Sequence, residues 1–157
     1  MSPATRPMPT KPAPRQSKPS LHPVKDAADA LHRAALECCH QHERIGALMK
    51  LGADDAEFAA AWEMADLAEA QLVARTAAYE TIAADGRGGE SEDWWHRANA
   101  LWMACREYAR RYAASADAAS RRKRHTAAEL SEIAVEYELE VSARMAVKQA
   151  MKGYGAA

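Results

Sequence analysis

Apolar residues return at a helical spacing through the first half of the chain. Over residues 24–51 they recur seven apart, and over 56–84 a second series has the same repeat. Such a repeat places its members on one stripe of a helix, which then faces a core. The two stripes are formed by Val24, Leu31, Cys38 and Ile45, with Ala28, Ala35 and Met49 as companions, and by Phe58, Ala65, Leu72 and Tyr79.

Two further helices are expected in the second half. The apolar stripe from Trp94 to Tyr112 predicts a helix over 91–123, whose last residues are basic. Thr126 and Glu129 match a capping box and open a helix predicted over 126–152. No glycine or proline separates these two helices, so a single bent rod is the alternative. The expected core side of the last helix comprises Leu130, Ile133, Tyr137, Val141 and Met145.

Glycines and aspartates mark the connections between the helices. Gly52 suits the left-handed cap that ends a helix, and Asp54 or Asp55 accepts hydrogen bonds from the free N–H groups of the next one. Three glycines within 86–89 end the second helix. Because the connections are short and the helices long, the sequence predicts an all-α fold over 24–157. The expected architecture is an antiparallel four-helix bundle with coiled-coil-like crossings.

The first 23 residues differ in composition from the rest. They contain all seven prolines, four basic residues and no acidic one, so their charge is +4 and the net charge of −1 leaves −5 for residues 24–157. Proline breaks helices, so we expect residues 1–23 to form a disordered basic tail. Transit peptides share this basic composition, but the prolines prevent their amphipathic helix. A leader without a role and a docking segment are the other interpretations.

The amino-acid composition limits the class of protein and the cellular compartment that we expect. The chain has 157 residues, 48% hydrophobic and 27% charged, which is typical of one folded domain. Its three cysteines and the lack of a secretory signal favour a reducing compartment, so we expect a cytoplasmic protein. No apolar run is long enough to cross a membrane, and no membrane partner is expected.

One group of residues has the chemistry of a metal or thiol site. Cys38 and His42 are four apart on the inner stripe of the first helix, and Cys105 lies on the inner stripe of the third. These three side chains are candidates for a three-ligand zinc or thiol site. The simpler interpretation is that the cysteines are small buried hydrophobes. Glu37-x-x-His40 has the spacing of di-iron bundles, but it lies on an outward, arginine-bearing face.

A basic run near the end of the third predicted helix is the strongest local charge feature. Arginines and lysines in this arrangement contact phosphates without reading sequence, so nucleic acid is a candidate partner. The alternative is a solvated helix end whose cations face the C-terminal carbonyls. The candidate residues for polyanion binding are Arg110, Arg111, Arg121, Arg122, Lys123 and Arg124.

Trp94 and Trp95 begin the third predicted helix. Adjacent helical residues point about 100° apart, so one of the two rings is expected near a surface. An exposed tryptophan beside a core is a common anchor of protein contacts, which makes this pair a candidate interface. The alternative is that both rings cover the open end of the bundle.

The sequence alone favours a non-catalytic protein. It contains no catalytic or nucleotide-binding motif, no cofactor is expected, and the stripes indicate no polar site inside the bundle. The first expectation is therefore a helical protein that acts through a protein partner or as a homo-oligomer. A nucleic-acid-binding accessory protein that uses Arg121–Arg124 is the alternative. A metal- or thiol-containing bundle is the third hypothesis.

Overall fold

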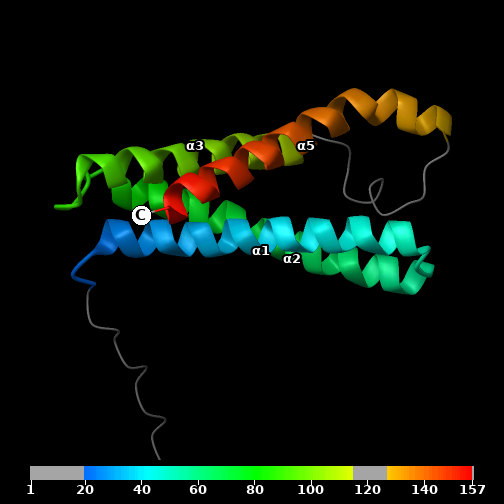
Figure 1. Cartoon of the computed structure of the whole chain (residues 1–157), viewed down its shortest axis with the longest axis horizontal. Coiled ribbons are helices and arrows are strands. Elements are labelled where there is room, and N and C mark those ends of the chain that lie inside the picture. Colours follow the sequence, from blue (N-terminus) through cyan, green and yellow to red (C-terminus); the bar gives the residue numbers. More distant parts are fainter. Residues whose placement is uncertain (1–19, 115–126, 157) are drawn as a thin grey trace, which may run out of the picture.

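The described part of the chain is built from helices. The computed structural model describes residues 20–114 and 127–156. These residues form no strand and four helices, and none of the helices combines the length and the apolar character that crossing a membrane requires. The predicted all-α, four-helix fold is confirmed. The helices are α1 (Pro23–Leu51), α2 (Asp55–Ala83), α3 (Glu92–Ala114) and α5 (Ala127–Gly155), as Figure 1 shows.

Some predicted features lie outside the described residues. These are the tail at 1–19 and the stretch 115–126, which contains the basic run Arg121–Arg124 and the junction between the third and fourth predicted helices. The side chains of 127–137 are also outside the described set, so the expected core positions Leu130, Ile133 and Tyr137 lie there too.

The turn between α1 and α2 has the predicted chemistry. Gly52 ends α1 with φ of 66°, in the left-handed region, and its N–H donates to the carbonyl of Met49 at 3.3 Å. Asp54 precedes α2, and its Oδ1 accepts a hydrogen bond from the N–H of Glu57 at 2.8 Å. Only one residue, Ala53, lies between these caps, so α2 starts beside the end of α1.

Side chains that are far apart in the sequence meet across the helices. In Figure 1, α1 and α2 form one pair and α3 and α5 lie above it. Contacts are most extensive within these two pairs. Among the described residues, the hydrogen-bonded side chains that join the pairs include Tyr79 with Asn99 and Tyr112 with Asp66 between α2 and α3, and Tyr154 with Asp29 and Lys148 with Glu43 between α5 and α1.

The described core follows most of the predicted stripe positions, but Val141 and Phe58 are only half-buried and two methionines are exposed. Leu31, Leu72 and Leu101 are fully buried, as the spacing predicts. Met145 was expected in the core and is 50% exposed, because it lies about 200° around α5 from the buried Val147. Met49 is 64% exposed, because Leu48 and not Met49 packs on the small cluster of Ile45, Ala61 and Ala65 that joins this end of α1 to α2.

Candidate metal centre

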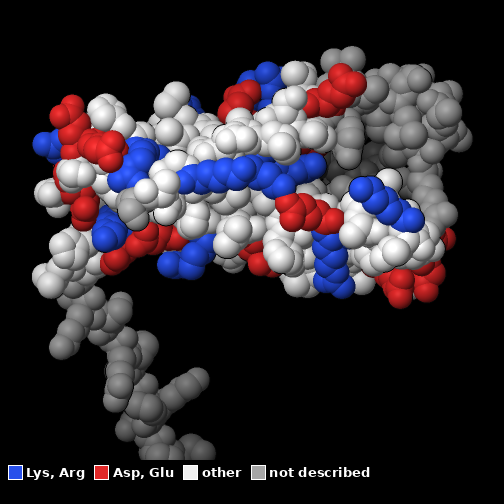
Figure 2. Space-filling model, viewed as in Figure 1, with Lys and Arg blue, Asp and Glu red and all other residues white. Residues whose placement is uncertain are grey.

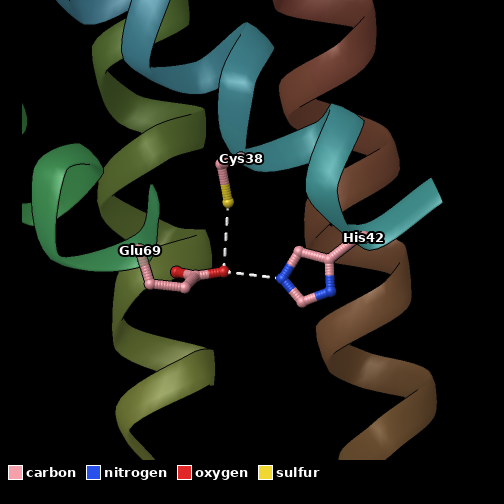
Figure 3. Close-up of side chains that lie close together, drawn as sticks. All are labelled: Cys38, His42 and Glu69. Carbon is pink, nitrogen blue, oxygen red and sulfur yellow. Dashed lines mark hydrogen bonds and ion pairs between the residues drawn. The ribbon is translucent and has the colours of Figure 1, made fainter. Parts of the chain in front are cut away.

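Four polar side chains meet in the core where α1, α2 and α3 pack together. Cys38 and His42 project from α1 one turn apart, Glu69 comes from α2 and Tyr108 from α3. These residues are only 1%, 9%, 3% and 1% exposed. Figure 3 shows Cys38 and His42 pointing from neighbouring turns toward one oxygen of Glu69. Because polar groups at this depth lack water, they must find partners among themselves.

One oxygen of Glu69 is the centre of the cluster. Its Oε1 lies 3.1 Å from Cys38 Sγ and 2.8 Å from His42 Nε2, and it also accepts a hydrogen bond from the Tyr108 hydroxyl. The Tyr108 hydroxyl lies 3.1 Å from His42 Nε2 as well. The second oxygen, Oε2, is buried and has no hydrogen-bond partner among the described residues. Three neighbours therefore compete for one acceptor, while an equivalent acceptor beside it is unused.

Burial holds the protons on Cys38 and Tyr108. Loss of solvent raises the pKa of the Cys38 thiol, and the nearby charge of Glu69 raises it further. The same two causes, in the same order, raise the pKa of the Tyr108 hydroxyl. Both groups are therefore neutral donors to Glu69 at neutral pH. A thiolate at Cys38 needs a positive charge beside it, and a metal cation is one source of that charge.

The donor atoms of Cys38, His42 and Glu69 have the composition and proximity of a metal site. The thiol sulfur, an imidazole nitrogen and a carboxylate oxygen all lie within 4.8 Å of one another. Zinc bonds of about 2.0–2.3 Å in a tetrahedron place such donors roughly 3–4 Å apart. The two separations from Glu69 Oε1, 3.1 Å to Cys38 Sγ and 2.8 Å to His42 Nε2, lie in or just below that range. A divalent ion would balance the two negative charges of a Cys38 thiolate and a Glu69 carboxylate. The unused oxygen of Glu69 is a further donor.

Glu69 is not among the site residues predicted from the sequence. The expectation of no polar site inside the bundle is wrong, because Cys38, His42 and Glu69 are buried together in the core. Glu69 lies four residues after Ala65 and three before Leu72, so helical spacing already places it on the inner stripe of α2. A charged residue at such a position is expensive to bury without partners. A charged residue at an inward position of α2 was therefore the feature of the sequence that could have predicted Glu69 as a site residue. The many alanines around the stripe made its inward side hard to recognise.

The structure brings together two of the three residues that the sequence proposed for a metal or thiol site. Cys38 and His42 share the cluster, whereas Cys105 is fully buried among apolar side chains and does not belong to the converging donors of the described residues. Burial, followed by the charge of Cys39, raises the pKa of Cys105 to about 12. Glu69 supplies the donor that Cys105 was expected to supply.

The two tryptophans of the candidate interface contact the core. Trp94 is 8% exposed and packs edge-on against Tyr154, with ring centroids 6.2 Å apart. Trp95 is half-buried and packs on the same core cluster. Their placement agrees with the alternative that both rings cover one end of the bundle, and it leaves only part of Trp95 open to a partner.

Of the candidate polyanion-binding residues, only Arg110 and Arg111 lie within the described part of the chain. Both donate to Glu107, at 2.8–3.0 Å and 2.9 Å, so one carboxylate offsets part of their charge. Basic and acidic side chains are interspersed over the face of the molecule that Figure 2 shows. The described residues on this face therefore do not form a surface of a single sign.

Known proteins do not indicate a family or a function for this chain. The chain matches no protein-family model, and no curated protein or solved structure matches it. The function is therefore argued from the geometry and chemistry of the site itself.

Proposed function

We propose that this protein is a metal-binding helical bundle that holds one divalent ion of the zinc class on Cys38, His42 and Glu69. The observation that carries the proposal is the convergence of three different donor atoms within 4.8 Å in the buried core. Glu69 Oε2, which has no hydrogen-bond partner within 20–114 and 127–156, supports it independently, because a buried carboxylate oxygen without a donor is rare in a protein interior.

The donor set selects the class of metal. Thiolate and imidazole are ligands for zinc, cobalt and related transition metals, whereas magnesium and calcium prefer sites made of oxygen. One carboxylate beside one sulfur and one nitrogen suits a borderline ion such as Zn²⁺. Because Cys38 and His42 come from α1 and Glu69 from α2, the ion would tie these helices together. Its binding free energy would then add to the stability of the fold.

The competing explanation is a hydrogen-bond network that never binds metal. Such a network satisfies Cys38, His42 and Tyr108 through Glu69 Oε1. It does not explain why Glu69 Oε2 is buried without a donor among the described residues. The two explanations make opposite predictions for a metal titration.

Cobalt titration and elemental analysis test the proposal. The untagged protein is stripped with a chelator and then titrated with Co²⁺, whose thiolate charge-transfer and tetrahedral ligand-field bands report a bound sulfur and the coordination number. We expect one ion per chain, loss of the charge-transfer band in Cys38→Ser, and an unchanged titration in Cys105→Ser. Cys105 is an apt control because it is as deeply buried as Cys38.

Two results would reject the metal site. The first is a stripped protein that takes up neither Co²⁺ nor Zn²⁺ while its circular dichroism stays helical. The second is equal loss of binding in Cys38→Ser and Cys105→Ser, which would point to general damage of the core instead of loss of a ligand.

The other expectations from the sequence stay predictions. They are association with a protein partner or a second copy, and nucleic-acid binding through Arg121–Arg124, which lie outside the described residues. The buried free thiols are compatible with the proposed reducing, cytoplasmic location. The strongly exposed large apolar residues are spread over the four helices and include Leu36, Leu67, Met103 and Met145.

A further inference from the structure

The proposed metal ligands all come from one pair of helices. Cys38 and His42 belong to α1 and Glu69 to α2, and these two helices have the most extensive contact in the described chain. Contacts between this pair and α3 are sparser. Tyr108 is the residue through which α3 reaches the cluster, since its hydroxyl donates to Glu69 Oε1.

Without a metal ion, the Tyr108 hydroxyl competes with two other side chains for Glu69 Oε1. Cys38 Sγ and His42 Nε2 are directed at the same oxygen, at 3.1 Å and 2.8 Å. A metal ion bound to Cys38 replaces the thiol proton, and one bound to His42 occupies the lone pair of the ring nitrogen. Both competitors are then removed, and Tyr108 becomes the one remaining donor to Glu69 among the described residues. Donors of this kind orient the carboxylates that bind metals.

We propose that Tyr108 is the positioning residue of the metal site, and that its hydrogen bond to Glu69 couples metal binding to the docking of α3 on α1 and α2. This inference rests on the proposed function. The coupling is reciprocal: if docked α3 strengthens metal binding, the metal must strengthen docking by the same factor. The loaded protein is then a tighter bundle than the metal-free one, and the bundle responds to metal.

Tyr79→Phe provides a matched control for Tyr108→Phe. Tyr79 is also fully buried, and its hydroxyl also joins α2 to α3, through Asn99 at 2.8 Å, but it does not belong to the cluster. Both variants thus lose one buried hydroxyl that bonds across the helix pairs, to Asn99 in Tyr79→Phe and to Glu69 and His42 in Tyr108→Phe. Outer-shell partners of metal ligands contribute about 10–100-fold in affinity. We expect a Co²⁺ affinity lowered by about that factor in Tyr108→Phe and unchanged in Tyr79→Phe.

Hydrogen exchange of the α3 amides supplies a second measurement on the same proteins. Zn²⁺ should slow exchange in α3 of the wild type and of Tyr79→Phe, and it should do so far less in Tyr108→Phe even at saturating Zn²⁺. The wild-type comparison stands by itself if Tyr108→Phe does not fold. If the rate of amide hydrogen exchange in wild-type α3 is the same with and without bound Zn²⁺, the proposed coupling is refuted.

The remaining outcomes separate this inference from the proposed function. Wild-type Co²⁺ affinity in Tyr108→Phe refutes the positioning role and leaves the metal site intact. If Tyr108→Phe and Tyr79→Phe lower the Co²⁺ affinity equally, the role of Tyr108 is purely structural. This result also refutes the inference. If the wild type binds neither ion, the proposed function fails and the coupling fails with it.

Discussion

His42 and Glu69 are 27 positions apart in the sequence, yet His42 Nε2 lies 2.8 Å from Glu69 Oε1 with both side chains buried. The contact exists because α2 returns along α1 after the turn at Gly52. It places an imidazole and a carboxylate in a core whose most frequent residue is alanine. A stable bundle does not need such a pair, since apolar residues of similar volume often serve as well. Function is therefore the better explanation for it.

Zinc should stabilise the protein against unfolding. At a hundredfold excess over its dissociation constant, a ligand that binds only the folded state adds about 2.7 kcal/mol. For a chain of this size that corresponds to about 5–10 °C in the unfolding midpoint. Differential scanning calorimetry with and without chelator measures the shift. Glu69→Gln should abolish it, whereas Glu80→Gln, on the exposed face of α2, should retain it in full. A shift that survives in Glu69→Gln would remove Glu69 from the ligand set.

Leu31 should be far more sensitive to truncation than Leu36 on the same helix. Leu31 is fully buried in the main core and Leu36 is 55% exposed. Leu31→Ala removes buried surface and leaves a cavity, so we expect a loss of about 2–5 kcal/mol. Leu36→Ala should change the unfolding free energy by less than about 0.5 kcal/mol. Urea denaturation measures both values, and similar losses would mean that the stripe of α1 faces another way.

Two glycines, Gly46 inside α1 and Gly52 at its C-terminal cap, should respond to alanine with opposite signs. Gly52 has φ of 66°, which alanine adopts only with strain, so Gly52→Ala should cost about 1–2 kcal/mol. Gly46 lies inside the helix with nothing within 4 Å of an added Cβ, so Gly46→Ala should add about 0.5–1 kcal/mol. Thermal unfolding of the two variants beside the wild type tests the pair. Stabilisation by Gly52→Ala would contradict the left-handed cap.

The metal-free protein should lose stability at alkaline pH, in part through Cys105. Burial raises the pKa of this thiol from 9.0 to about 12, so the folded protein keeps a proton that the unfolded chain releases above pH 9.0. The unfolded state then binds fewer protons, and the unfolding free energy falls as pH rises through this window. Urea unfolding at about pH 8 and about pH 11 measures the fall.

Cys105→Ala serves as the comparison for the alkaline measurement. The variant has no thiol proton at this position, so its unfolding free energy should fall less over the same interval. Burial also raises the pKa of Tyr79 to about 12 and of Cys39 to about 11, so part of the fall should remain. An identical fall in both proteins would show that Cys105 loses its proton as easily in the folded state as in the unfolded one.

Features that depend on neighbours in the chain were predictable. The cap at Gly52, the N-cap at Asp54 and the inward stripe through Leu31 and Leu72 follow from chemistry within one or two helical turns. The prediction was wrong for Met145 because α5 carries apolar residues on more than one side. Packing against the other helices selects the side that contains Val147.

The candidate site was only half predictable. Cys38 and His42 are one turn apart on the same helix, so their proximity needs no tertiary information. Glu69 and Tyr108 come from other helices, and their heights along the bundle depend on how the helices slide and rotate against one another. Cys105 has the right phase on α3 for an inward position, and yet Tyr108, three residues later, is the side chain that reaches Glu69.

The sequence by itself determined that this chain forms helices, where the first two begin and end, and which stripe of each turns inward, because backbone hydrogen bonding and helical periodicity act over a few residues. Only the tertiary structure decided that a thiol, an imidazole, a carboxylate and a phenol meet at one point. That meeting depends on the relative height and rotation of three helices. Many side chains along the contact surfaces of the helices determine this height and rotation together, so neither can be predicted from a short segment of the sequence.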